Sequence, residues 1–68
     1  MTPNGTAIRE IRKLRGMAVR ALAASAGLHH THLSRVERGE AGVGEANLRA
    51  IADVLGVPVA AINREELS

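Results

Sequence analysis

Apolar residues along this 68-residue chain recur at the three- and four-residue spacing of amphipathic helices, and polar residues fill the positions between them. The spacing predicts four helices, over residues 6–15, 19–26, 30–38 and 45–55, and a short fifth helix after Pro58. The residues expected to face inward are Ile8, Ile11, Leu14, Leu22, Ala23, Ala26, Leu33, Val36, Leu48, Ile51, Ala52, Leu55, Val59 and Ile62.

Glycines mark the ends of the first four predicted helices. Gly16, Gly27, Gly39 and Gly56 each follow a periodic segment, and a left-handed residue commonly stands directly after a helix. No segment alternates between apolar and polar residues as a half-buried strand would. The sequence therefore predicts an all-α fold, a compact bundle of five short helices.

The length allows one domain, which we expect to cover residues 6–63. Residues 1–5 should form a flexible N-terminus and residues 64–68 a C-terminal tail. The absence of Phe, Trp and Tyr leaves an aliphatic core, which a second copy of the chain would help to stabilise. The absence of cysteine excludes disulfides and thiolate metal sites. No signal peptide or membrane span is evident, so a cytoplasmic protein is expected.

Charge is distributed unevenly, although the formal net charge is only +2. Arg9, Arg12, Lys13, Arg15 and Arg20 precede the acidic second half of the chain. Such an asymmetry fits a face that meets phosphates, and it also fits an ordinary solvated surface. Charge alone does not decide between the two interpretations.

The segment from Val19 to Val36 carries the most specific pattern. Small Ala23 permits close helix packing, Gly27 supplies the turn, and Leu33 with Val36 anchors the following helix. Two helices joined by a tight glycine turn form a helix-turn-helix, here over residues 19–38. The unanchored residues of the second helix are all polar, as a helix in a DNA major groove requires: His30, Thr31, Ser34, Arg35 and Arg38.

Residues 7–63 resemble the lambda-repressor-like (Cro-type, XRE) helix-turn-helix family. The matching pieces are I-R-E-I-R-K-L-R-G, L-A-A-S-A-G-L, L-S-R-V-E-R-G and L-R-A-I-A-D-V-L-G-V-P. The resemblance implies a sequence-specific transcription regulator, such as a repressor, that binds double-stranded DNA as a homodimer on an inverted repeat.

The resemblance also implies a role for each position of the interface. Base edges would be read by His30, Thr31, Ser34 and Arg35. Phosphates would be contacted by Val19, Arg20, Arg38, Gly42, Val43 and Gly44. Arg12 and Glu37 would form a structural salt bridge between the first and third helices.

The chain departs from the family pattern at two positions. Val19 stands where the family often has Gln, so readout from this position is apolar or absent. His29 stands where a Ser or Thr often caps the third helix. The second departure affects how the predicted helix over residues 30–38 begins.

An apolar set near the C-terminus either closes the core or forms a dimer patch: Val57, Val59, Ile62 and Leu67. Family members often dimerise through this end, which places two recognition helices on successive turns of the major groove. The sequence leaves both interpretations of the set open.

Other functions have weaker support in the sequence. An antitoxin-like or adaptor module would use the same fold to dock a protein partner, but the Arg-bearing polar face argues against it. No nucleophile has a base beside it, so an enzyme is not expected. His29, His30 and His32 lack the further ligands of a closed metal site, and no metal, cofactor or small-molecule ligand is expected.

Overall fold

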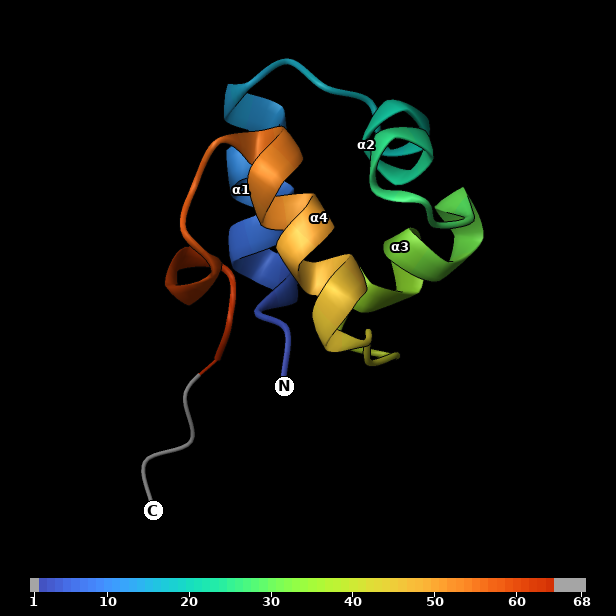
Figure 1. The fold of residues 1–68 in the computed structure, drawn as a ribbon. Coiled ribbons are helices and arrows are strands. Elements are labelled where there is room, and N and C mark those ends of the chain that lie inside the picture. The colour runs from blue at the N-terminus through green and yellow to red at the C-terminus, as the bar shows by residue number, and fades with distance from the viewer. Residues whose placement is uncertain (1, 65–68) are drawn as a thin grey trace.

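Each helix begins and ends close to the residues that the sequence predicts. The computed structural model describes residues 2–64 and contains α1 (Gly5–Leu14), α2 (Val19–Ala26), α3 (His30–Glu37) and α4 (Glu45–Leu55) (Figure 1). The bounds of α2 and α4 match the prediction, whereas α1 lies one residue earlier and α3 ends one residue earlier. Within residues 2–64, no helix has the length and apolar character that crossing a membrane requires.

The prediction that glycines mark the ends of the helices is confirmed. Gly16, Gly27, Gly39 and Gly56 all have positive φ, between 68° and 77°. At Gly27, where α2 turns into α3, the Leu28 N–H donates back to the Ala23 carbonyl at 2.8 Å. This bond satisfies a carbonyl at the helix end and fixes the tight turn of the helix-turn-helix.

The prediction of a fifth helix is wrong. After Pro58 the chain makes only the three-residue 3₁₀ turn η1 (Val59–Ala61). Beyond this turn the backbone pairs with the N-terminus, because the Ile62 carbonyl accepts a 2.8 Å hydrogen bond from the Asn4 N–H. Ile62 itself has φ −123° and ψ 10°, so the helical conformation ends at this residue.

The same pairing joins the N-terminal segment from Thr2 onward to the segment after η1. The Arg64 N–H donates to the Thr2 carbonyl at 2.7 Å, and Pro3 forms an isolated antiparallel bridge with Asn63. Asn4 then caps α1, since its Oδ1 accepts from the Ala7 N–H at 3.1 Å. The fold therefore brings the two ends of the described chain together.

The aliphatic core lies where α2 packs against α3 and α4, and α1 against α3 (Figure 1). Its buried apolar residues are Ile8, Leu22, Ala23, Ala26, Leu33, Val36, Leu48, Ile51, Ala52, Leu55 and Ile62. Ile11 and Val59 pack against this core while remaining half-buried.

The prediction that Leu14 faces the core is wrong, because its side chain is 82% exposed. Successive steps of three residues rotate backwards around a helix with 3.6 residues per turn, so Leu14 leaves the stripe that begins at Ile8. Arg15, which directly follows α1, is exposed as well. Its Nε donates to the Leu55 carbonyl at 3.0 Å, which places a cation at the C-terminal end of α4.

Gly5 allows α1 to approach the end of α3 without a side chain between them. Gly5 is buried, and a Cβ at this position would overlap the Val36 carbonyl oxygen and lie 2.6 Å from that of Glu37. The N-terminal end of one helix thus faces the C-terminal carbonyls of another, an arrangement that their opposite dipole ends favour. This contact fixes α3 relative to α1.

Candidate nucleic-acid interface

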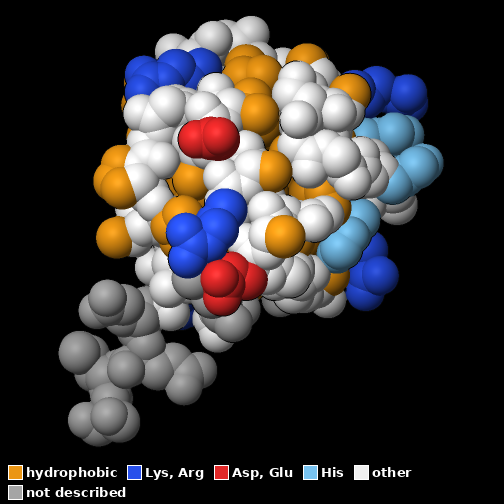
Figure 2. Space-filling model, in the orientation of Figure 1, with side chains coloured by type: hydrophobic (Ala, Val, Ile, Leu, Met, Phe, Trp, Pro, Cys, Tyr) orange, Lys and Arg blue, Asp and Glu red, His pale blue; other side chains and the backbone are white. Residues whose placement is uncertain are grey.

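One side of α3 is anchored in the core and the other is open to solvent. Leu33 and Val36 are fully buried. Thr31 and Arg35 are exposed, and His30 with Ser34 is half-buried. Figure 2 shows histidine side chains gathered with Lys and Arg side chains along the edge formed by α2 and α3. The four predicted base-reading residues therefore share one polar surface.

His29 replaces the expected Ser or Thr at the start of α3. Its Nδ1 accepts a 3.2 Å hydrogen bond from the Thr31 N–H, so the imidazole caps the helix. The His29 and His30 rings stack with centroids 4.6 Å apart. The departure from the family pattern thus leaves the entry to α3 well defined.

His30, the first residue of α3, lies in surroundings that disfavour its protonated form. Desolvation, followed by the positive charge of Arg20 and by the neighbouring His29 imidazole, lowers the pKa of His30 below its ordinary value. His30 is thereby favoured in its neutral form, which can both donate and accept a hydrogen bond.

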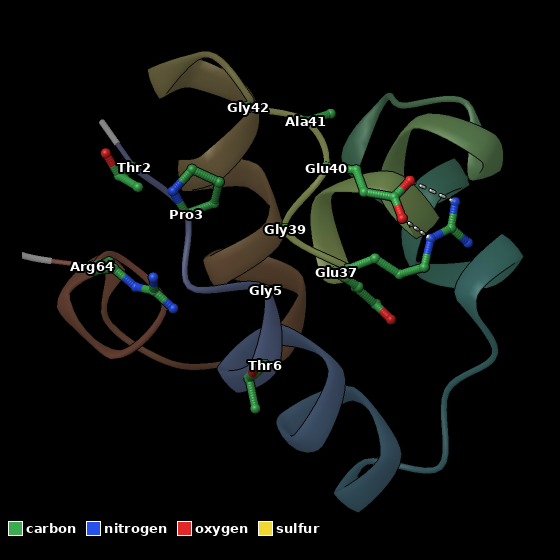
Figure 3. Close-up of a pocket in the computed structure, with 11 residues that line it drawn as sticks. Thr2, Pro3, Gly5, Thr6, Glu37, Gly39, Glu40, Ala41, Gly42 and Arg64 are labelled. Atoms are coloured by element: carbon green, nitrogen blue, oxygen red, sulfur yellow. Dashed lines mark hydrogen bonds and ion pairs between the residues drawn. The ribbon is translucent and has the colours of Figure 1, made fainter.

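Arginines at the far end of α3 are held by one acidic residue. Glu40 binds Arg38 through two contacts of 3.1 and 3.3 Å (Figure 3). The Glu40 carbonyl accepts a 3.4 Å hydrogen bond from Arg35. The Arg38–Glu40 ion pair is solvent-exposed, so its contribution to stability is small. Both guanidinium groups therefore remain accessible at the surface.

The loop from Gly39 to Gly44 is tied to α3 by His32. The His32 Nε2 donates a hydrogen bond to the Gly42 carbonyl oxygen at 2.9 Å. Gly42 and Gly44 are exposed, and Val43 is half-buried. The predicted phosphate-contacting backbone of this loop thus lies beside the end of α3, and the sequence alone does not indicate this role for His32.

Arg12 and Glu37 form the ion pair that the resemblance implies. The Arg12 Nε and Nη2 donate to the two Glu37 carboxylate oxygens at 2.8 and 3.0 Å. A third bond runs from Arg12 Nη1 to the Met17 carbonyl at 2.8 Å. The side chains are only 13% and 6% exposed, and the hydrogen bond with Glu37 raises the pKa of Arg12. The pair joins α1, α3 and the turn before α2.

The predicted dimer patch divides into different environments. Ile62 is fully buried in the core of the single chain, so this residue fits the first of the two interpretations, that the set closes the core. Val57 and Val59 are half-buried and border a shallow hollow on α4, beside Arg49 and Asp53. The predicted contribution of Leu67 falls outside the described residues.

A metal site receives no support from the arrangement of the histidines. His29 caps α3, whereas His32 is turned toward the loop after it. Across residues 2–64, no three side chains among His, Asp and Glu converge as metal ligands would.

Comparison with known proteins places this arrangement in a family. A family model described as helix-turn-helix matches residues 8–62. A curated relative, the uncharacterized HTH-type transcriptional regulator RghRB of Bacillus subtilis, is 36% identical over 59 residues. That match covers 85% of this chain and 42% of the relative, so the chain spans less than half of the relative's length.

Two solved structures share the fold. The clp gene regulator ClgR of Corynebacterium glutamicum matches with a TM-score of 0.80 and 34% identity, covering 82% of this chain and 60% of that one. The restriction-modification controller protein C.AhdI of Aeromonas hydrophila matches with a TM-score of 0.80 and 30% identity, covering 84% of this chain and 86% of that one. The chain therefore belongs to the helix-turn-helix family of XRE type, a family of DNA-binding transcription regulators.

Proposed function

We propose that the chain binds double-stranded DNA sequence-specifically and regulates transcription, with α3 in the major groove. The observation that carries the proposal is the polar side of α3, which is exposed while Leu33 and Val36 are fully buried. A helix held in this way presents hydrogen-bonding groups to base edges at no cost to the core. The regulators among the relatives support the role in transcription.

Contacts to bases and to phosphates have different tasks in this interface. His30, Thr31, Ser34 and Arg35 are assigned to base edges, where the Thr31 methyl suits thymine and Arg35 suits guanine. Phosphates are assigned to Val19 and Arg20 at the start of α2, and to Arg38, Gly42, Val43 and Gly44 at the other end of α3. Phosphate contacts supply most of the affinity, and base contacts select the sequence.

Dimerisation would match the protein to an inverted repeat. The half-buried Val57 and Val59, next to the hollow on α4, remain the candidates for the contact between copies. In a symmetric dimer the two α3 helices would enter the major groove about 34 Å apart. The half-sites would then be centred about 10 base pairs apart.

Selection of bound duplexes from a random pool at about 0.15 M salt tests the proposal. We expect a palindrome with the half-site spacing given above. Recovery of a single half-site would argue for a monomer and against the dimer. Failure to enrich any sequence would contradict sequence-specific binding and would favour a module that docks a protein partner.

Replacing Arg35 with alanine should reduce sequence discrimination. We expect the preference for the selected duplex over a shuffled one to fall by about 10- to 100-fold, since a bidentate guanine contact contributes about 1–3 kcal/mol. Fluorescence anisotropy titrations with both duplexes measure this ratio. Arg35→Lys is the control, because it keeps the charge and loses the bidentate geometry. If Arg35→Ala discriminates like wild type, Arg35 does not read guanine.

Replacing Glu40 with glutamine should strengthen DNA binding. The carboxylate of Glu40 engages the Arg38 guanidinium and would repel a phosphate approaching it. We expect a several-fold gain in affinity that is similar for selected and shuffled duplexes, with unfolding changed by less than about 0.5 kcal/mol. Titration at two salt concentrations measures the gain. Weaker binding would show that Glu40 instead orients Arg38 for its contact.

A further inference from the structure

A hollow of about 400 Å³ lies where α1, α2 and α3 meet. It is lined by Arg9, Arg12, Val19, Ser34, Glu37 and Arg38. Arg9 and Arg12 lie one turn apart on α1, and Ser34 on α3 lies four residues before Arg38, the C-cap of that helix. Val19 is the first residue of α2. Three helices thus contribute side chains to one open concavity.

The side chains that line this hollow carry a net positive charge. Glu37 is its one acidic lining residue, and both of its carboxylate oxygens are engaged by Arg12. Arg38 has a weak, exposed partner in Glu40, which does not line the hollow. Within residues 2–64, Arg9 takes part in no ion pair. An anion placed here would face two guanidinium groups whose charge is not compensated from within the hollow.

The position of the hollow identifies the anion. Its wall includes Ser34, which also belongs to the polar side of α3 assigned to base edges. Val19, another lining residue, is the first residue of α2, and the first backbone N–H groups of a helix lack helical acceptors. An anion held here would stand at the margin of the groove that α3 enters, where the DNA backbone runs.

We propose that this hollow holds one backbone phosphate of DNA and that Arg9 is a ligand to that phosphate. The inference rests on the proposed function and adds a contact from α1, a helix that neither the sequence nor the resemblance assigns to DNA. A guanidinium from α1 facing Arg38 across the hollow would clamp the phosphate from two sides. The clamp would set how far α3 enters the groove.

Arg9→Gln and Lys13→Gln are the matched variants for the test. Both residues are exposed cations on α1, and only Arg9 lines the hollow. Titrations of selected and shuffled duplexes over a range of salt should show that Arg9→Gln weakens both complexes by about the same factor, roughly 5- to 10-fold. The slope of log affinity against log salt should decrease by about 0.9, the value for one lost phosphate contact. Lys13→Gln should change affinity less than about twofold and leave the slope nearly unchanged.

Equal behaviour of the two variants would overturn the assignment, as would an Arg9→Gln effect confined to the selected duplex. The thermal unfolding midpoint of Arg9→Gln should equal that of wild type, which separates a lost contact from a damaged fold. Arg9→Lys should recover most of the affinity, because a phosphate accepts a point charge. If wild type itself binds no duplex, the proposed function fails. If wild type binds and Arg9→Gln binds equally well, only this inference fails.

Discussion

Gly5→Ala should strongly destabilise the domain, although it adds only one methyl group. The new Cβ would overlap the Val36 carbonyl oxygen and approach that of Glu37 to 2.6 Å, so backbone would have to move. We expect a loss of at least about 3 kcal/mol, the upper end for overpacked sites. A domain of 68 residues has only about 3–10 kcal/mol of stability in total. Urea unfolding followed by circular dichroism measures the loss.

Gly42→Ala is the matched control for this experiment. No heavy atom lies within 4 Å of a Cβ at Gly42, and its φ is not positive. The same chemical change should therefore alter stability by less than about 0.5 kcal/mol. Similar unfolding midpoints for the two variants would show that α1 does not approach α3 as closely as described.

Glu37→Ala should have the second large effect on stability. It leaves the mostly buried Arg12 guanidinium with the Met17 carbonyl and without its two carboxylate contacts. Removing one partner of a buried ion pair costs about 3–5 kcal/mol, and the lower value suits a pair that keeps some exposure. We expect a lower urea midpoint and a thermal midpoint lowered by more than about 10 °C, since about 1 kcal/mol shifts the midpoint of so small a domain by about 4–8 °C.

A second ion pair in the same chain provides the comparison. Arg49 and Glu45 are 3.3 Å apart, with side chains 63% and 60% exposed. Arg49→Gln should change stability by less than about 0.5 kcal/mol, because exposed pairs contribute little. A Glu37→Ala transition as stable as that of Arg49→Gln would mean that the Arg12–Glu37 pair does not join the helices.

Local signals explain the part of the fold that the sequence predicts correctly. The bounds of α2 and α4 are set by apolar spacing and by Gly27 and Gly56, which act within a few residues. The all-helical architecture follows from the same signals, and the family resemblance adds how α2 and α3 pack.

Contacts between distant segments explain the errors. The backbone of Ile62 pairs with that of Asn4, and a 3₁₀ turn forms where a fifth helix is predicted. The residues near Pro58 carry no signal of this long-range pairing. The expectation that Leu14 faces the core extends three-residue spacing one step too far. Arg15, the next residue, is exposed as well, and it donates to the carbonyl of Leu55 on α4.

In the candidate interface, too, some features can be predicted from the sequence and others cannot. The resemblance identifies the polar face of α3 and the Arg12–Glu37 pair, because these depend on helical register in a known fold. It does not reveal that His32 binds the Gly42 carbonyl, or that Glu40 engages Arg38. Those contacts arise from side-chain choices particular to this chain, as does the exposure of Arg9 beside the hollow.

Equilibrium titration of the selected duplex and a shuffled duplex of the same composition, at about 0.15 M salt, tests the central claim most directly. If α3 reads bases, wild type should prefer the selected duplex by at least about 10³-fold. Equal affinity for the two duplexes would contradict sequence-specific recognition by this chain.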